Sequence, residues 1–144
     1  MAVRKIPIKG ELDSKGRGVT FSIEVMSNTE YFGFAIRDVV VHTINKEWRA
    51  GHYHTKDSDK TEIFVTVCGT AKLIWHDRPT PDKEYRWFMH PLTEAGLVYR
   101  VEPGACHKIV GLTCDPPFLT LSLNNQVYDE KHDPECEHGL TKDC

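Results

Sequence analysis

The feature that most narrows the fold of this chain is a series of short apolar runs with strand-like alternation. Valine, isoleucine, phenylalanine and tyrosine recur at every second place, as they do in a strand with one buried face. No window of about 11 residues sustains an apolar i, i+3, i+4, i+7 stripe, so helices are not expected to build the core. The predicted strands are residues 19–25, 32–44, 62–68, 70–76, 84–89, 97–101 and 117–123. The pattern predicts an all-β sandwich or barrel.

Two segments between these runs have the character of a turn and of a loop. Gly69 separates 62–68 from 70–76, and glycine supplies the positive φ of a tight turn, so the two runs are expected to pair as an antiparallel hairpin. Residues 77–84 combine charged residues with two prolines and are expected to form an exposed loop.

Length and composition indicate a single globular domain. The chain has 144 residues, of which 40% are apolar and 27% charged. A chain of this length buries enough surface to hold a core without cross-links. We expect one domain over residues 1–144, with its core at about 19–124 and a polar C-terminal arm or tail at 125–144.

Charge and hydropathy exclude several classes of partner. The net charge is −3, without the basic excess of a nucleic-acid-binding protein. No stretch approaches the roughly 18 apolar residues of a membrane span, and no targeting segment is visible at the start. We therefore expect no nucleic-acid partner, no membrane partner and a cytoplasmic location.

The five cysteines are expected to be reduced thiols. Their number is odd, no signal peptide precedes them, and no pair has Cys-x-x-Cys spacing. The group Cys136, His138 and Cys144 could bind zinc, but a charged tail with chance thiols is the favoured interpretation.

Three histidines are the main candidates for a functional role. His52 and His54 are two residues apart in an extended segment, so their rings would project to the same side. His107 follows a Pro-Gly turn and opens another apolar run. Neutral imidazoles with one carboxylate suit zinc, iron, manganese or nickel. The alternative is a solvated strand face, which the third histidine disfavours.

The order of these residues resembles the first of two motifs of the cupin superfamily, which are small jelly-roll β-barrels. His52, His54, Glu62 and Gly69 occur in the family order, and six residues separate Glu62 from Gly69 as in the family. Seven residues lie between His54 and Glu62, where the family has three or four. Two other carboxylates, Asp57 and Asp59, are therefore alternatives to Glu62, and the leading glycine of the motif is replaced by Lys46.

The second cupin motif is matched by Gly96, Gly104 and His107. Glu102 stands where the family has proline, and Gly111 replaces an asparagine. The resemblance covers about residues 32–124 and implies a jelly-roll barrel. It also implies a possible divalent metal, with no organic cofactor, on His52, His54, Glu62 and His107.

Local strings are similar to one branch of the superfamily. Residues 48–54 and 124–130 resemble sugar 3,4-ketoisomerases and the cupin domains of capsule-sugar synthesis enzymes, and residues 13–18 are similar to the Asp-x-Arg-Gly segment of sugar epimerases, two residues longer. The resemblance implies an enzyme that isomerises or epimerises a nucleotide-linked 4-keto-6-deoxy sugar.

The roles that follow from this resemblance remain alternatives. His52 or His54 would be the base, and Tyr53 or Tyr99 would protonate the enediolate. The candidates for substrate binding are Arg37, Arg49 and Lys108, for the diphosphate, and Trp48. Trp48, Trp75 and Trp87 are better explained as core or dimer contacts than as a platform for a nucleotide base.

Two other functions fit the same residues. One is an iron-dependent oxygenase acting on a small organic molecule, and the other is a non-catalytic cupin that binds a sugar or a metal. A homodimer is expected in each case, because small cupins often pair by strand exchange and the run at 32–44 is longer than a usual strand.

Overall fold

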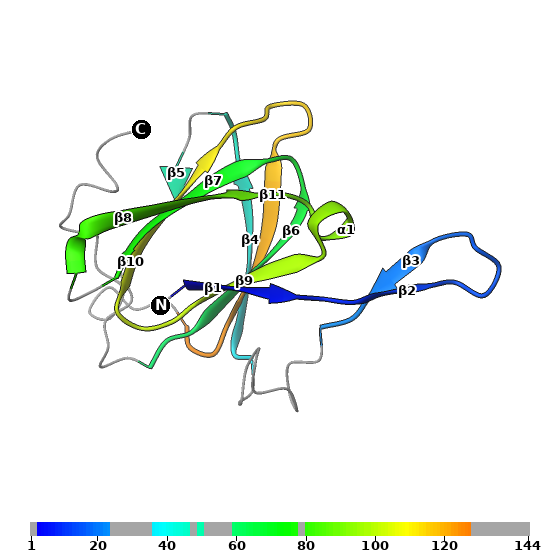
Figure 1. Ribbon diagram of the computed structural model, residues 1–144, viewed down its shortest axis with the longest axis horizontal. Coiled ribbons are helices and arrows are strands. Elements are labelled where there is room, and N and C mark those ends of the chain that lie inside the picture. The colour runs from blue at the N-terminus through cyan, green and yellow to red at the C-terminus, as the bar shows by residue number, and fades with distance from the viewer. Residues whose placement is uncertain (1–2, 24–35, 47–48, 51–58, 78–79, 128–144) are drawn as a thin grey trace.

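The computed structural model describes residues 3–23, 36–46, 49–50, 59–77 and 80–127, with the backbone alone at 49–50, 77 and 80–82. Antiparallel strands dominate, which confirms the predicted all-β class (Figure 1). The elements are β1 (Val3–Pro7), β2 (Gly10–Leu12), β3 (Val19–Phe21), β4 (Asp38–Ile44), β5 (Arg49–Ala50), β6 (Glu62–Cys68), β7 (Ala71–Asp77), β8 (Thr80–Met89), α1 (Leu92–Ala95), β9 (Leu97–Val101), β10 (Ala105–Gly111) and β11 (Phe118–Asn124).

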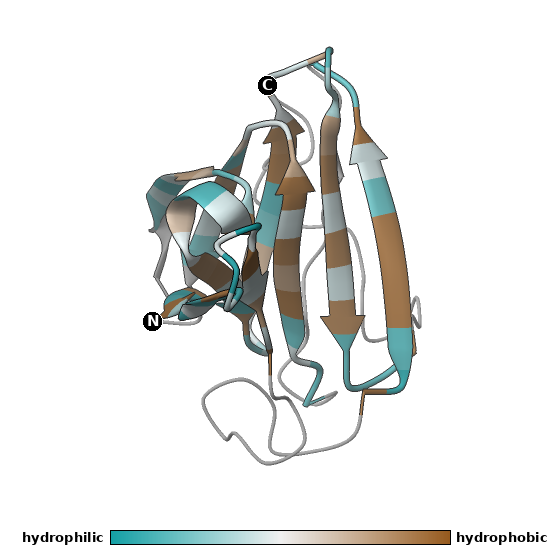
Figure 2. Ribbon diagram, turned by 90° about the vertical axis from the view of Figure 1, so that its right-hand side faces the viewer, coloured by the Kyte–Doolittle hydropathy of each residue, from teal (hydrophilic) through white to brown (hydrophobic). Residues whose placement is uncertain are grey.

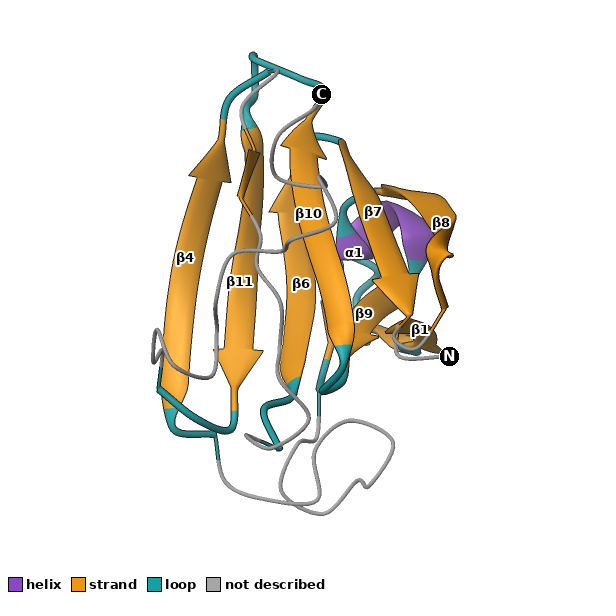
Figure 3. Ribbon diagram, turned by 90° about the vertical axis from the view of Figure 1, so that its left-hand side faces the viewer, coloured by secondary structure: helices purple, strands orange, loops and turns teal. Residues whose placement is uncertain are grey.

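Two sheets form the body of the molecule. The first has five strands in the order β1-β9-β6-β11-β4, and the second has four in the order β5-β10-β7-β8. Figure 3 shows the long strands of both sheets side by side around a common interior. Strands β2 and β3 pair only with each other and project from the body as a hairpin. In the described part of the chain, no helix is long and apolar enough to cross a bilayer.

The main core fills the space between the two sheets. Alternation puts every second residue of a strand on this inner face, as the brown and pale bands along the strands of Figure 2 illustrate. The largest buried members of the cluster are Phe64, Leu73, Trp75, Met89, Tyr99, Ile109 and Phe118. A second cluster packs α1 and the N-terminal segment against the outer face of the first sheet, through Ile6, Ile8, Ile63, Val65, Leu92 and Val98. Each such side chain contributes about 1.5–3 kcal/mol when fully buried.

Several predicted strands have the observed bounds. The runs 62–68 and 97–101 coincide with β6 and β9, and 117–123 is displaced by one residue from β11. The run 19–25 is a strand only at β3, and the run 32–44 is a strand at β4, with residues 24–35 outside the described part.

The predicted hairpin between 62–68 and 70–76 is wrong. β6 pairs with β9 and β11, whereas β7 pairs with β8 and β10 in the other sheet. Gly69, with φ +75°, therefore passes the chain from one sheet to the other. A glycine turn between two apolar runs has the same local sequence in both arrangements, so only the distant partners of each strand distinguish them.

Three further features differ from the prediction: the length of one loop, the presence of β10 and the start of the core. The loop expected at 77–84 is shorter, because β8 begins at Thr80. β10 was not predicted as a strand. The core begins well before residue 19, because β1 pairs with β9 and buries Val3 to 1% exposure.

The expectation of reduced cysteines holds for two of the three described residues. Cys68 and Cys114 are free thiols. Cys106 is disulfide-bonded, so the expectation is wrong for this residue. Its side chain lies on the outer face of β10 against Ile74, where it is fully buried.

Candidate active site

The barrel interior holds His107, the third histidine of the predicted site. It lies on β10 opposite Trp75 of β7, is 1% exposed, and its ring centroid is 5.9 Å from that of Phe64 on the facing sheet. Gly104, at φ +94°, makes the turn between β9 and β10 that starts this strand. His107 therefore points inward, as the sequence requires for a shared site.

A buried carboxylate faces this histidine from the first sheet. Glu62, the first residue of β6, is 3% exposed, and its Oε1 lies 3.3 Å from Nε2 of His107. Of the alternative carboxylates, Asp59 is exposed and contributes its backbone oxygen to a bond from Asn125, and Asp57 lies outside the described residues. The structure thus brings Glu62 together with His107 despite the longer spacing after His54.

Two further polar residues extend this pair along β11. The hydroxyl of Ser122 donates a hydrogen bond to Oε2 of Glu62, and Nδ2 of Asn124 donates to Oγ of Ser122 at 2.9 Å. Both are buried and both face the interior. Ser122 therefore fixes one carboxylate oxygen of Glu62, while the other oxygen faces His107.

Ser122 and Asn124 were not predicted from the sequence. The available signal is that Thr120, Ser122 and Asn124 alternate with leucines, so the polar set of this strand shares one face. That pattern usually marks a solvated face. Here the apolar set lies outward, only half-buried, and the polar set is fully buried.

Tyr99, a predicted acid, occupies a structural position. Its side chain is 1% exposed, and its hydroxyl donates to the backbone oxygen of Phe88 at 3.0 Å. Burial raises the pKa of Tyr99. The bond joins β9 of the first sheet to β8, the edge strand of the second sheet. The hydroxyl therefore links the two sheets.

The predicted phosphate-binding residues are scattered. Arg37 is exposed, and its backbone N–H donates to the oxygen of Asn124 at 2.8 Å, which puts it at the same end of the barrel as Glu62. Lys108 follows His107 on β10 and so projects from the opposite face, where it is 2% exposed. The backbone of Arg49 pairs with Val110.

The remaining predicted site residues lie outside the described part of the chain: Trp48, His52, Tyr53, His54, Cys136, His138 and Cys144. Within the described part, no group of three or more His, Cys, Asp or Glu residues is arranged to hold a metal. His107 and Glu62 are the two of the four predicted ligands that lie in the described part of the chain.

The aromatic residues near the site form part of the core, as predicted for Trp75 and Trp87. Trp75 stacks on Tyr85 with a centroid distance of 4.2 Å and meets Trp87 edge-on at 5.4 Å. Lys5 lies 4.5 Å above the Trp87 ring and Lys83 lies 4.9 Å above that of Tyr85. These contacts cover the half-buried rings at the edge strand β8.

The departure from the second cupin motif at Gly111 has a steric cause. A Cβ at this position would overlap the backbone oxygens of Ile44 and Asn45. Asparagine does not fit there, because the backbone of residues 44–46 passes directly over β10.

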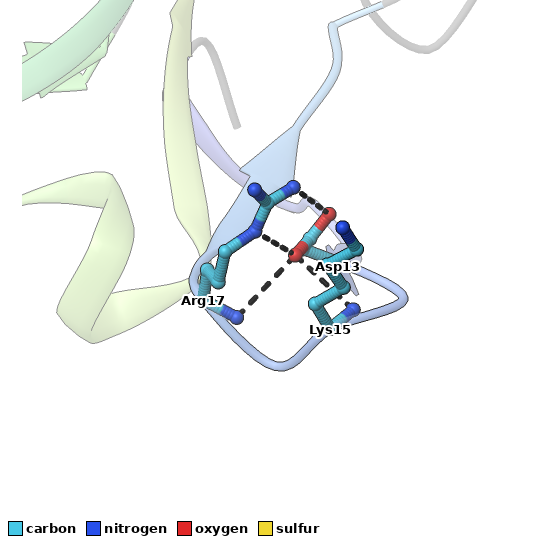
Figure 4. A network of polar contacts seen from close by, with 3 residues as sticks. All are labelled: Asp13, Lys15 and Arg17. Atoms are coloured by element: carbon cyan, nitrogen blue, oxygen red, sulfur yellow. Dashed lines mark hydrogen bonds and ion pairs between the residues drawn. The ribbon is translucent and has the colours of Figure 1, made fainter.

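The segment that resembles the epimerase Asp-x-Arg-Gly motif forms the tip of the projecting β2–β3 hairpin (Figures 1 and 4). Asp13 accepts hydrogen bonds from the backbone of Lys15 and from the guanidinium of Arg17, whose Nε is 2.9 Å away. The Arg17 guanidinium holds the pKa of Asp13 below its usual value. Figure 1 shows the tip of this hairpin well away from β10, the strand that carries His107.

A second histidine–glutamate pair lies on the outer face of the second sheet. Nε2 of His76 on β7 is 3.6 Å from Oε2 of Glu84 on β8. Burial opposes ionisation of Glu84, but Arg86 and His76 together outweigh it and keep the pKa of Glu84 below its usual value. This pair is more exposed than the interior pair and faces away from it.

Comparison of the structure with solved structures finds close likeness in shape at low sequence identity. No family model and no curated protein matches the sequence. The sugar 3,4-ketoisomerase QdtA of Thermoanaerobacterium thermosaccharolyticum, in complex with TDP, has a TM-score of 0.74 at 20% identity over 97% of this chain and 92% of its own. The fold is the cupin jelly roll.

Two other similar structures represent related activities. The TDP-fucose-3,4-ketoisomerase WlaRA of Campylobacter jejuni has a TM-score of 0.74 at 12% identity, covering 99% of this chain and 95% of its own. The 3'-monoepimerase ChmJ of Streptomyces bikiniensis, in complex with dTDP-quinovose, has a TM-score of 0.75 at 17% identity, covering 92% and 68%. These likenesses confirm the cupin fold that the two motifs predicted.

Proposed function

We propose that this chain is an enzyme that isomerises or epimerises a nucleotide-linked 4-keto-6-deoxy sugar. The observation that carries the proposal is the buried pair of His107 and Glu62, 3.3 Å apart inside the barrel. The pair occurs in a fold that this chain shares with two TDP-sugar ketoisomerases and a sugar epimerase. Hydrogen-bonded support from Ser122 distinguishes the pair from a chance contact.

The reaction needs a base and an acid on a reactive carbon next to a carbonyl. In a 4-keto sugar, the C3 proton is acidic, and its removal gives an enediolate across C3 and C4. A proton returned to C4, with transfer of the hydroxyl proton from O3, gives the 3-keto isomer. A proton returned to the other face of C3 gives the epimer.

The inward imidazoles are proposed to carry these proton transfers. Imidazole exchanges protons near neutral pH, and Glu62 orients His107 and selects its tautomer. His52 or His54 is the proposed partner base and Tyr53 the proposed acid, on the sequence alone. Arg37, exposed at the same end of the barrel, is the proposed diphosphate contact. Arg49 and Lys108 are the other sequence candidates for the diphosphate, and Trp48 is a further sequence candidate for substrate binding.

A divalent metal would use the same residues. Two ligands about 2.0–2.2 Å from one Zn²⁺ lie at a separation compatible with the 3.3 Å between Nε2 of His107 and Oε1 of Glu62. His52 and His54 would complete the set. The metal would polarise the sugar carbonyl, and a ring that binds it would not act as a base. Elemental analysis of protein purified without chelator decides between these routes.

The proposed activity is tested with TDP-4-keto-6-deoxyglucose in D2O. We expect deuterium at C4 of a 3-keto product if the enzyme is an isomerase, or at C3 if it is an epimerase, as measured by NMR and mass spectrometry. Protein carrying His107→Asn is the control for contaminating activity. An unchanged sugar without deuterium, after prolonged incubation with wild-type protein, contradicts the proposal. A reaction that requires bound iron and consumes oxygen would favour the iron-dependent oxygenase instead.

We also propose that the chain forms a homodimer through the outer face of β4. This edge strand exposes Val39 at 55% and Val41 at 59%, beside the half-buried outward leucines of β11. Exposed apolar patches of this kind mark interaction surfaces. We expect Val41→Lys to convert a dimer into a monomer in sedimentation velocity, whereas Phe88→Lys, at a 58% exposed site on the other sheet, should leave the dimer intact. A monomeric wild-type protein at about 100 times the assay concentration would contradict this.

A further inference from the structure

Three buried polar atoms on inward-facing residues have no hydrogen-bond partner within the described part of the chain. They are Oγ1 of Thr66, Nε1 of Trp75 and Oδ1 of Asn124. Leaving such a group unsatisfied costs about 1–3 kcal/mol, so each calls for an explanation. Together they offer a donor, an acceptor and a hydroxyl to the barrel interior, which is the complement of a molecule with several hydroxyls.

Asn124 is the best fixed of the three. Its Nδ2 donates to the backbone oxygen of Ser122 at 3.2 Å and to the Ser122 hydroxyl at 2.9 Å, so both amide protons are used. The residue is 3% exposed and is the register partner of Glu62 on the neighbouring strand. Its Oδ1 is therefore an oriented acceptor beside the carboxylate that faces His107.

We propose that Oδ1 of Asn124 accepts a hydrogen bond from a hydroxyl of the hexose. The inference rests on the proposed function, which it deepens by naming a residue that binds the sugar rather than the nucleotide. Because Asn124 and Glu62 are both tied to Ser122, the same contacts that orient the carboxylate orient the acceptor. Asn124 thereby determines which ring carbon lies against the pair of His107 and Glu62.

The proposal predicts a selective loss of affinity in Asn124 variants. Two probes are titrated calorimetrically: TDP, and dTDP-quinovose, which lacks the carbonyl and is not turned over. In Asn124→Leu, we expect the affinity for dTDP-quinovose to fall roughly tenfold, the equivalent of one lost hydrogen bond to a buried group. The affinity for TDP should change less than about twofold, because no nucleotide contact is removed.

Asn125 supplies the matched control. Its Oδ1 accepts from the backbone of Thr61 at 2.8 Å and its Nδ2 donates to the oxygen of Asp59 at 2.9 Å, so both ends of its amide are bonded within the protein. Asn125→Leu should lower the melting temperature without changing the ratio of the two affinities. Asn124→Ser, which keeps a polar group but shortens it, should show the same selective loss if Asn124→Leu fails to fold.

The outcomes separate the two proposals. Equal losses for both probes, or no loss, would mean that Oδ1 of Asn124 meets only water, and would overturn the inference while leaving the enzyme proposal intact. Wild-type protein that shows the selective binding but no turnover of the 4-keto sugar would overturn the proposed reaction and leave the sugar contact. Binding of neither probe by wild-type protein would overturn both.

Discussion

Glu62→Gln is expected to lower the turnover of the 4-keto sugar by about 10–100-fold, the range that loss of a residue orienting a functional histidine costs. The amide has nearly the same shape as the carboxylate, so it can still accept the hydrogen bond from Ser122. It cannot present a charged acceptor to Nε2 of His107, which lies 3.3 Å away. The imidazolium formed during proton transfer then lacks its counter-charge, and the neutral ring is free to adopt the other tautomer.

The matched control for this variant is Glu84→Gln. Glu84 also lies near a histidine, with 3.6 Å between its Oε2 and Nε2 of His76, but on the outer face of the second sheet. It should leave turnover within about twofold of wild type, because nothing buried in the barrel changes. Rates from deuterium incorporation in D2O, measured on folded protein, make the comparison. Similar losses in both variants, or full activity in Glu62→Gln, would exclude the interior pair from the chemistry.

Gly69→Ala is expected to destabilise the protein by roughly 2–6 kcal/mol, which combines backbone strain with overpacking. Gly69 has φ +75°, a conformation that other residues rarely adopt. A Cβ there would lie 2.6 Å from the backbone oxygen of Pro117 and 2.7 Å from the backbone nitrogen of Phe118. The neighbouring atoms are backbone, so they cannot turn away as a side chain would. A loss of this size is a large part of the 5–15 kcal/mol by which domains are stable.

Gly16→Ala separates the effect of backbone strain from the effect of steric overlap. Gly16 has φ +66° at the tip of the β2–β3 hairpin, and a Cβ there would meet nothing within 4 Å. It should cost about 1 kcal/mol from strain alone. Urea unfolding of both variants gives the difference, which measures the clash at Gly69. Equal effects would show that the crossing between the sheets tolerates a side chain.

The sequence alone could not identify which carboxylate belongs to the candidate site. The long spacing after His54 left Glu62, Asp57 and Asp59 as alternatives, because loop length does not say which acidic residue returns to the interior. The start of β6 decides it: Glu62 is the first strand residue, its register partner is Asn124, and alternation turns it inward with Phe64. Asp59, three residues earlier, is exposed.

Ser122 and Asn124 could not be predicted as site residues from the sequence, for a different reason. Alternation in 117–123 correctly indicates a strand, but it does not state which face is buried. The leucines of β11 face outward and are half-buried, while Ser122 and Asn124 face the interior and are fully buried. Which set faces inward depends on the second sheet, whose strands are far away in the chain.

By itself, the sequence determined the all-β class, most strand positions, the cupin pattern and the choice of His107, because strand alternation and motif spacing are local properties. Only the tertiary structure decided that β6 and β7 belong to different sheets, that Glu62 meets His107, and that Ser122, itself bonded by Asn124, donates to the carboxylate. These depend on hydrogen bonds between strands distant in sequence. The local sequence of a strand does not determine which distant strand will form hydrogen bonds with its backbone.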